Sequence, residues 1–361
     1  MAVILQSLAT ATPTHDIAQS HAASLAAERC CFTPEHERLL PLLYRRTRVD
    51  RRGSVLLEHA ADTAQAEGFF PPAVDDADRG PTTAMRLQRY VAEANDLAIT
   101  AARDALQRIA CDPRHVTHLV TVSCTGFVSP GVDIAIIDAL GLSRQVARTH
   151  VGFMGCHGAL NGLRAASSHA AADPDARVLL CAVELCTLHF SYGWHPQRIV
   201  ANALFADGAA AVVLGHGDAD TPWTIAGHGS CVFPDSLDAM TWTIGDHGFE
   251  MTLSPRVPEL ISEHLRPWLT GWLARHDLTI DAVGSWAIHP GGPRIVSTAA
   301  QALSLAPDAV DASRQVLAAH GNMSSPTVLF IVGRLMKQDA PRPCVAMAFG
   351  PGLAVEAALL R

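Results

Sequence analysis

Cys156 has the sequence setting that most favours covalent chemistry. It lies in VGFMGCHGALNGLR, where an apolar run gives way to an alanine-rich helical pattern. If a helix begins just after Gly155, its unpaired N–H groups favour the thiolate over the thiol. Glycines at positions 155 and 158 would also let a substrate approach the sulfur closely. Because free cysteines are often simply buried, this stretch alone fits both a nucleophile and a core residue.

A cysteine nucleophile needs a partner that accepts its proton or pairs with it as an ion. His289 is the best placed of 18 histidines, because it ends the apolar run SWAIHP at an expected exit from a strand. Asn322, in HGNMSSPTVLF, stands at an expected turn before a helix start. A histidine satisfied by nearby backbone and a local asparagine turn are the alternatives. Papain-like proteases also combine Cys, His and Asn, but the sequence that typically surrounds their cysteine is missing.

Alternating strand and helix patterns must position these residues. The N-terminal run MAVILQSLAT indicates a first strand and not a signal peptide. We expect residues 71–81 to form an exposed loop, and a boundary near residues 217–225. The alternation predicts an α/β fold with helices on both faces of the sheets. Apolar runs predict buried strands at 117–124, 176–185, 209–216, 282–290 and 343–352, and helical patterns cover 82–109, the segment after Cys156, 255–276 and 324–338.

The composition excludes several classes of protein. The 361 residues are 49% hydrophobic and 17% charged, which is typical of a globular chain, and the net charge of −8 argues against general nucleic-acid binding. Nine irregularly spaced cysteines do not resemble a secreted disulfide framework, and no run reaches the roughly 20 apolar residues that span a bilayer. We therefore expect a cytoplasmic protein without membrane insertion or a nucleic-acid partner. No Walker loop, dinucleotide fingerprint or CxxC pair occurs, so we expect no cofactor and no metal.

Five motifs carry a resemblance to a known family. GFMGCHGALNGLR, ALFADGAAAVVLG, IHPGGPRIV, HGNMSSPTVLF and AFGPGLAVE occur in this order. Together they closely resemble the type III polyketide synthases, the chalcone synthase-like family, from about residue 5 to the end of the chain. The stretches CTGF and ELCTLHF are similar to the bacterial branch that makes alkylresorcinols and alkylpyrones from fatty acyl-CoA starters.

The resemblance implies a thiolase-like, five-layered αβαβα fold and a homodimer. The fold would consist of two similar halves. Residues 1–220 would carry the nucleophile, and residues 221–361 would carry its partners. Cys156 would hold the acyl group, and His289 and Asn322 would complete a catalytic triad. The implied substrates are acyl-CoA and malonyl-CoA, which is decarboxylated for each condensation. Donors from His289 and Asn322 suit the enolate that loss of CO2 leaves, whereas a carboxylate at position 322 would repel it.

The resemblance also implies the residues that line the substrate cavity. Phe205 matches an aromatic gatekeeper, and Gly352 belongs to the FGPG loop that shapes the cavity wall. Where the family usually has a second aromatic gatekeeper, this chain has Met251, which suggests a differently shaped passage. The other positions that match the lining are Cys124, Thr125, Ser129, Cys186 and His189.

Basic and glycine residues match the family's CoA contacts. Arg46, in the arginine-rich stretch YRRTRVDRR (44–52), aligns with a residue that binds CoA phosphates. Gly291 and Gly292 would let their loop lie against the pantetheine arm. For the other arginines of this stretch, a solvated surface with salt bridges is the alternative.

Three alternative functions remain open at the level of sequence. A ketoacyl-ACP synthase of the third kind shares the fold and the triad but condenses once onto a carrier protein, although HPGGP and FGPGL favour the polyketide synthase. A related synthase would take an aryl or short starter, and a catalytically dead relative would keep only the cavity. The sequence leaves open the starter length, the number of extensions and the mode of ring closure.

Overall fold

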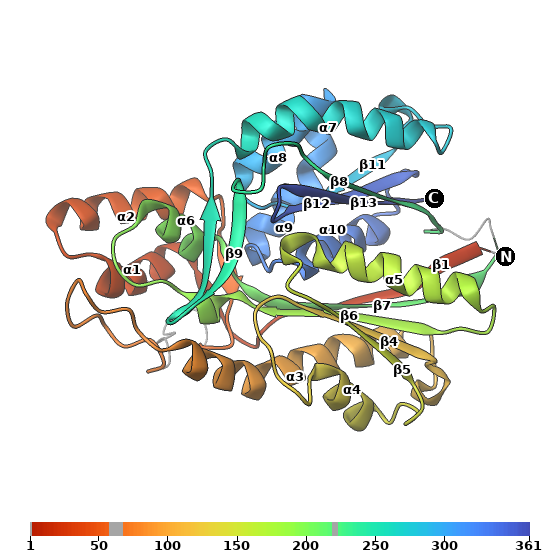
Figure 1. The fold of residues 1–361 in the computed structure, drawn as a ribbon, viewed down its shortest axis with the longest axis horizontal. Coiled ribbons are helices and arrows are strands. Elements are labelled where there is room, and N and C mark those ends of the chain that lie inside the picture. Colours follow the sequence, from red (N-terminus) through yellow and green to blue (C-terminus); the bar gives the residue numbers. More distant parts are fainter. Residues whose placement is uncertain (1, 58–67, 219–222) are drawn as a thin grey trace.

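The computed structural model describes residues 2–57, 68–218 and 223–361, in which two β-sheets lie one above the other (Figure 1). One sheet has the strand order β1-β7-β6-β4-β5 and the other has the order β11-β12-β13-β8. The strands of the first sheet are β1 (Ala2–Ala11), β4 (His118–Ser123), β5 (Ala147–Gly152), β6 (Val178–Leu185) and β7 (Asp207–Gly217). Those of the second are β8 (Ile225–Val232), β11 (Ser285–Ile288), β12 (Cys344–Gly350) and β13 (Ala354–Leu360).

The two sheets repeat one topology. In the first, β7 is antiparallel to both β1 and β6, and β6 is parallel to β4. In the second, β13 is antiparallel to both β8 and β12, and β12 is parallel to β11. The chain is therefore built from two similar halves, of which the first has the additional edge strand β5.

Helices form three layers around the sheets, so that five layers alternate from top to bottom of Figure 1. The helices α7 (Val257–Ala274) and α8 (Pro293–Leu303) cover the second sheet, and α3 (Thr83–Gln107) and α4 (Val132–Leu140) cover the first. Between the sheets lie α5 (Gly158–Ala172), α9 (Asp311–His320) and α10 (Pro326–Lys337). This arrangement confirms the predicted αβαβα layering.

The central strands are apolar on both faces because each face packs against a helix layer. Successive side chains of β6 alternate between the central layer and the outer layer under α3. Leu180 and Ala182 face the centre, whereas Cys181 and Val183 face α3. The predicted strands and helices are all confirmed, with ends that differ by up to three residues. The predicted loop at 71–81 is irregular and mostly exposed.

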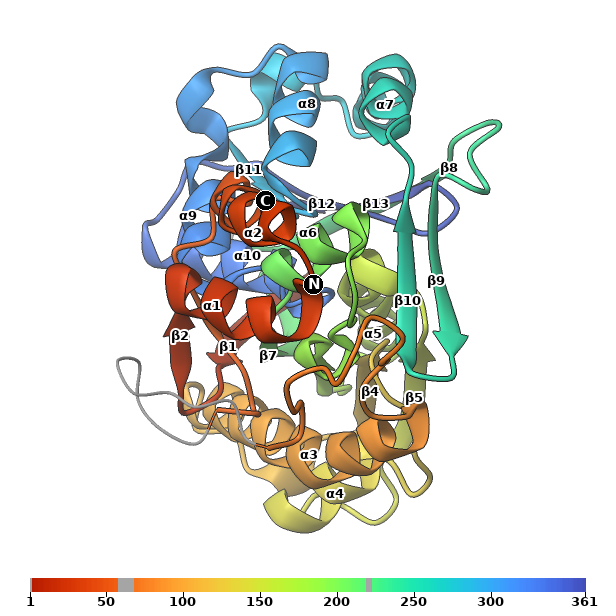
Figure 2. The same cartoon turned by 90° about the vertical axis from the view of Figure 1, so that its left-hand side faces the viewer.

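Short elements flank one end of the layers. These are α1 (Gln19–Cys30), α2 (Pro34–Arg46), α6 (Pro196–Leu204), β2 (Asp16–Ala18) and β3 (Arg51–Gly53). A hairpin of β9 (Met240–Gly245) and β10 (Gly248–Leu253) runs across the layers beside them (Figure 2). Its far end is held to the start of α3, where the Thr83 hydroxyl donates to the carbonyl of Gly245 and accepts from the N–H of Gly248 at 2.8 Å.

All nine cysteines are free, and none of the helices described is long and apolar enough to cross a membrane. The expected boundary at 217–225 falls between β7 and β8, and residues 219–222 of it lie outside the described residues.

Candidate active site

Cys156 lies in a single turn of 3-10 helix (Gly155–His157) that runs directly into α5. The sharp entry depends on Gly155, whose φ of +73° is in the left-handed region. A Cβ at this position would lie 2.5 Å from Cδ of Pro351. The FGPG loop therefore packs directly against the turn that presents the nucleophile.

Two helix N-termini meet at the Cys156 side chain. One is that of α5, and the other is that of the equivalent helix of the second half, α10, which Ser324 and Ser325 precede. The side chains of Asn322 and Ser324 both hydrogen bond to the sulfur and lower its pKa. Burial outweighs them, however, and raises the pKa of Cys156 to about 11. The backbone N–H and side-chain donors at the helix start thus favour the thiolate in the predicted direction, but they do not outweigh burial.

Asn322 is buried and held by its own backbone. Its N–H donates to the carbonyl of Leu204 at 2.8 Å, and its carbonyl accepts from Ala206 at 2.9 Å, so that it forms a parallel bridge with Phe205. Its side-chain oxygen accepts the N–H of Ser324 at 2.8 Å. The amide NH2 group is thus left to donate to the sulfur of Cys156.

His289 follows β11 and is almost completely buried. Within the described residues, neither of its ring nitrogens has a hydrogen-bond partner, so it makes no hydrogen bond to Cys156. Burial, reinforced by the neighbouring His157, lowers the pKa of His289 to about 3. The imidazole is therefore neutral and has one nitrogen free to accept a proton.

Glu184 is a buried carboxyl group that the sequence analysis did not identify. It accepts hydrogen bonds from the Ser325 hydroxyl at 2.7 Å, and from the Thr125 hydroxyl and the Cys124 N–H at 2.8 Å each. Burial raises its pKa to about 7, although these donors oppose the shift. Its signal in the sequence was an acidic residue in the otherwise apolar run 178–185.

A cavity of about 30 Å³ adjoins Cys156, and a cleft of about 420 Å³ lies further out. Four residues line both, and so form the partition between them: Cys186, Phe205, Trp242 and Met251. The predicted gatekeeper positions Phe205 and Met251 therefore lie between the small cavity and the outer cleft. Cys124, Thr125 and Cys186 also line the small cavity, as predicted from the resemblance.

His189 lines the outer cleft and not the small cavity. Its Nδ1 accepts the N–H of Phe249 at 2.9 Å, which leaves Nε2 to donate to the carbonyl of Thr125 at 2.7 Å. Its ring also stacks on that of Phe249, with centroids 4.1 Å apart. Burial lowers its pKa to about 3, so the ring is a neutral part of the wall.

Five predicted contact residues do not line the small cavity or the outer cleft. Ser129 is exposed on a surface hollow beside Phe127, because the chain turns outward after Thr125. Gly352 has a φ of +118° and shapes the loop, whereas its neighbour Pro351 lines the cavity. The other three are Arg46, exposed at the end of α2, and Gly291 and Gly292, in the loop between His289 and α8.

Two further residues near Phe205 have roles that the sequence analysis did not identify. Trp242, on β9, donates its indole N–H to the carbonyl of Cys124 at 2.9 Å. Arg52 is buried behind Phe205 and donates to its carbonyl at 3.0 Å. In the sequence, Trp242 belongs to no motif, and Arg52 is one arginine among five.

Comparisons with known proteins cover the whole chain. Residues 2–218 match the family model of the N-terminal domain of chalcone and stilbene synthases, and residues 228–361 match that of the C-terminal domain. Pks18 of Mycobacterium tuberculosis, an "alpha-pyrone synthesis polyketide synthase-like" protein, is 31% identical over 99% of this chain and 90% of its own. The 1,3,6,8-tetrahydroxynaphthalene synthase of Streptomyces peucetius is 33% identical over 98% and 91%.

Among solved structures, PKS-I of the brown alga Ectocarpus siliculosus superimposes with a TM-score of 0.92 and 30% identity, covering 100% of this chain and 98% of the other. The type III polyketide synthase domain of Steely1 from Dictyostelium gives a TM-score of 0.90 and 26% identity, covering 100% and 99%. These likenesses confirm the thiolase-like fold.

Proposed function

Because the chain belongs to the chalcone and stilbene synthase family of type III polyketide synthases, we propose that Cys156, His289 and Asn322 perform its acyl transfer and decarboxylative condensation. The observation that carries this assignment is the position of Cys156 beside a small cavity next to a large cleft, with the side chains of Asn322 and Ser324 near enough to its sulfur to lower its pKa. No other cysteine of the chain combines a helix start with such donors within the described residues.

In the loading step, the sulfur of Cys156 attacks the carbonyl carbon of the acyl-CoA. Neutral His289 accepts the thiol proton, because a sulfur with a pKa of about 11 does not lose it unaided. The bond between the carbonyl carbon and the CoA sulfur breaks, and the CoA thiolate takes the proton from His289. The starter is then held as a thioester on Cys156.

In the extension step, malonyl-CoA loses CO2, and the electron pair of the broken C–C bond forms an enolate. The amide of Asn322 and a ring nitrogen of His289 donate to the enolate oxygen. The enolate carbon attacks the Cys156 thioester, which forms a C–C bond and releases the cysteine sulfur. One proton is taken up in this step and restores the thiol.

We propose a fatty acyl-CoA starter and an alkylpyrone or alkylresorcinol product. Support comes from the outer cleft, whose lining includes the aliphatic side chains of Ile17, Leu25, Leu56 and Leu57. A chain of methylene groups would bury its surface there, at about 0.8 kcal/mol for each group. The printed name of the mycobacterial relative, which refers to alpha-pyrone synthesis, points to the same product class.

Phosphate binding and assembly complete the proposal. We assign the CoA phosphates to Arg46, which is exposed, and the pantetheine arm to Gly291 and Gly292. A homodimer is supported by two neighbouring apolar side chains on the surface, Phe127 and Val128, which are 40% and 38% exposed. A second copy of the chain would cover this apolar surface. The proposed enzyme needs no metal or organic cofactor, and we place it in the cytoplasm. Its N-terminal half is assigned to residues 1–220 and its C-terminal half to residues 221–361.

Incubation of the purified protein with malonyl-CoA and acyl-CoA starters of different length tests the function. Mass spectrometry should show triketide or tetraketide pyrones or resorcinols, with the highest yield from long alkyl starters. An acyl adduct should form on the protein and disappear in Cys156→Ala. A single condensation that requires a carrier protein, or a preference for aryl or short starters, would contradict the proposal. A purified protein on which no acyl adduct forms would also contradict the proposal.

A further inference from the structure

His157 follows the nucleophile in the chain and has no part in the chemistry proposed above. It stands where the 3-10 turn runs into α5, and its side chain is almost completely buried. It lines neither the small cavity beside Cys156 nor the outer cleft. A group that is buried next to the reacting sulfur but out of reach of the substrate can influence the reaction only through other side chains.

One hydrogen bond fixes the position of the proton on the His157 ring. Nδ1 lies 2.7 Å from the side-chain oxygen of Asn161, one helical turn further along α5. A carbonyl oxygen only accepts hydrogen bonds, so Nδ1 carries the proton and Nε2 keeps its lone pair. In the part of the chain that the structure describes, Nε2 is buried and has no hydrogen-bond partner. The ring of His157 therefore has an unused acceptor inside the protein.

This acceptor lies at the end of β12, where His289 also stands. The ring of His157 packs on the main chain of Gly350, the last residue of β12, since a Cβ there would lie 2.7 Å from Nε2. The N–H of His289 donates to the carbonyl of Met347 on the same strand at 2.8 Å. The two imidazoles interact electrostatically, and neither ring nitrogen of His289 has a hydrogen-bond partner among the described residues. An unused acceptor and an unpartnered imidazole thus share one buried site.

The proposed loading step needs such an acceptor. When His289 takes the thiol proton of Cys156, it becomes an imidazolium with an N–H on both ring nitrogens. A buried cation is costly unless a partner compensates for it, and burial already lowers the pKa of His289 to about 3. The charged groups nearest to His157, Arg164 and Glu356, form an ion pair with each other, so they are already compensated.

We infer that His157 is a positioning residue for His289, whose Nε2 accepts an N–H of the imidazolium that forms when Cys156 gives up its proton. The inference rests on the proposed function. The hydrogen bond is not made in the structure, where both rings are neutral, and it forms together with the charge. The transferred proton stays on His289 until the CoA thiolate takes it, so His157 neither gains nor loses a proton. Asn161 contributes by keeping the proton of His157 on Nδ1.

The rate of acyl-adduct formation on Cys156 tests this inference, measured from the mass of the intact protein over a range of acyl-CoA concentrations. His157→Phe keeps a ring against Gly350 but has no acceptor. Its maximal loading rate should fall by about tenfold or more, the loss expected for a hydrogen bond to a charged group. The acyl-CoA concentration at half-maximal rate should not change, since residue 157 lines neither hollow. His228→Phe is the control, because His228 is also partly buried and hydrogen-bonded, to Ser167, and lines neither hollow.

Two variants of Asn161 separate this role from packing. Asn161→Ala lets the proton of His157 move to Nε2, so the maximal loading rate should fall in the same direction as in His157→Phe. Asn161→Asp again offers an oxygen to Nδ1 and should recover most of the lost rate. If His157→Phe does not fold, as judged by thermal unfolding, this pair decides the question, and equal loading rates in Asn161→Ala and Asn161→Asp overturn the inference.

The effect of His157 should also disappear without His289. In His289→Ala the loading is slow, and the addition of His157→Phe should slow it no further. A further loss of the same size in the double variant overturns the inference, and so does a folded His157→Phe that is loaded at the wild-type rate. Failure of the proposed function looks different, since the wild-type protein would then form no acyl adduct, and this result would overturn both.

Discussion

At the residue scale, the site keeps the Cys156 thiol and the His289 imidazole uncharged before the reaction. Burial raises the pKa of Cys156 to about 11 and lowers that of His289 to about 3, so at neutral pH the proton resides on sulfur. Burial also raises the pKa of Glu184, to about 7. In a site of low polarity a charge is costly until a substrate or a partner compensates for it. Reactivity here depends on proton transfer at the moment of attack.

Asn322 should matter more for decarboxylation than for loading. Asn322→Ala removes a donor to the enolate, and we expect CO2 release from malonyl-CoA to fall by about 10²-fold, while the acyl adduct on Cys156 still forms. Release of labelled CO2 and the mass of the intact protein measure the two steps. Asn322→Asp is the matched variant of equal size, whose charge should impair both steps. An equal loss of both steps in Asn322→Ala would contradict this division of roles.

His189 should make the folded protein sensitive to acid. Its pKa is about 3 in the folded state and about 6.5 in an unfolded chain, so below pH 6.5 only the unfolded state takes up the proton. The stabilising contribution of neutral His189 is complete above pH 6.5. Below pH 6.5 the free energy of unfolding falls by about 1.4 kcal/mol for each pH unit. We expect urea unfolding of His189→Gln to depend less steeply on pH between 6.5 and 4.5.

The matched control for this experiment is His115→Gln, at an exposed position. Glu184 changes the pH dependence of stability in the opposite direction, because its pKa is raised on folding. This contribution is the same in the wild type, His189→Gln and His115→Gln, so it cancels when their unfolding free energies are compared. Parallel pH profiles of wild type and His189→Gln would show that the histidine is not buried as a neutral ring.

The sequence predicted the residues whose role rests on local pattern or motif, and missed those whose role comes from distant contacts. Cys156 and Asn322 were predicted and do meet. Glu184 and Trp242 were missed, since each gains its place only where separate segments converge. The sequence showed the helix start that favours the thiolate of Cys156, but not the depth of burial that opposes it.

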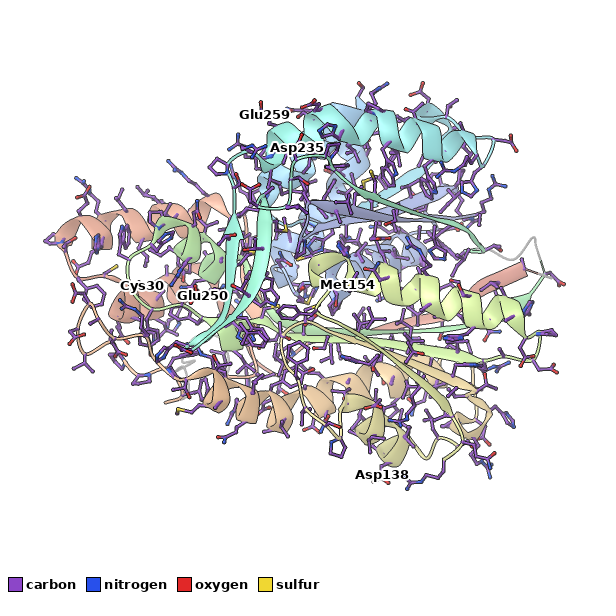
Figure 3. All side chains as sticks on the ribbon, in the orientation of Figure 1. Cys30, Asp138, Met154, Asp235, Glu250 and Glu259 are labelled. Carbon is purple, nitrogen blue, oxygen red and sulfur yellow. The ribbon has the colours of Figure 1, made fainter. Side chains whose placement is uncertain are left out.

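At the element scale, the β9–β10 hairpin carries the passage but has little core of its own. Its residues are mostly partly or fully exposed, and it is held at the far end by Thr83. A second contact joins Glu250 of β10, labelled in Figure 3, to Arg198 of α6 at 2.9 Å. Such an element is identified poorly from sequence, because neither strand has a clear apolar face.

Loss of the Thr83 contacts should loosen the hairpin. Thr83→Ala removes the hydrogen bonds to Gly245 and Gly248, and we expect a loss of about 1 kcal/mol in stability, with faster amide exchange in residues 240–253. Hydrogen exchange with mass spectrometry measures this. The neighbour Thr82 instead caps α3, so Thr82→Ala should cost similar stability without faster exchange in the hairpin. Equal exchange in both variants would show that the hairpin is held elsewhere.

The turn that presents Cys156 should not tolerate a side chain at Gly155. Gly155→Ala adds a Cβ that collides with Pro351, in addition to the strain of a positive φ, and should abolish the acyl adduct. Gly141→Ala has a nearly equal φ of +69° but meets no atom within 4 Å, so it should cost about 1–2 kcal/mol and keep the adduct. Thermal unfolding and adduct mass measure both, and an adduct in Gly155→Ala would contradict the packing described here.

At the scale of the whole molecule, the two halves share the central helix layer. Val328 and Phe330 of α10, from the second half, belong to the same core cluster as Leu5 and Leu8 of β1, from the first. Arg164 of α5 forms an ion pair with the buried Glu356 of β13. Neither half can cover its sheet without the other. The layering was predictable from apolar runs and the family resemblance, but the strand order was not, because patterns do not show which strands pair.

This shared layer predicts cooperative unfolding. We expect one transition in calorimetry, with calorimetric and van't Hoff enthalpies that agree. Residues 1–220 expressed alone should lack a cooperative transition, since the face of the first sheet that α10 covers would be open to water. Two separate transitions, or a stable isolated half, would show that the halves are independent domains.

The backbone bridge between Phe205 and Asn322 has a consequence for the diversity of such enzymes. The bridge is made by main-chain atoms, so the side chain of residue 205 can be exchanged without altering the hydrogen bonds that hold Asn322. Selection can thus reshape the entrance in single mutational steps while the reaction centre stays intact. A change of the Phe205 side chain can therefore alter the space next to Cys156 while the main-chain hydrogen bonds of Asn322 remain.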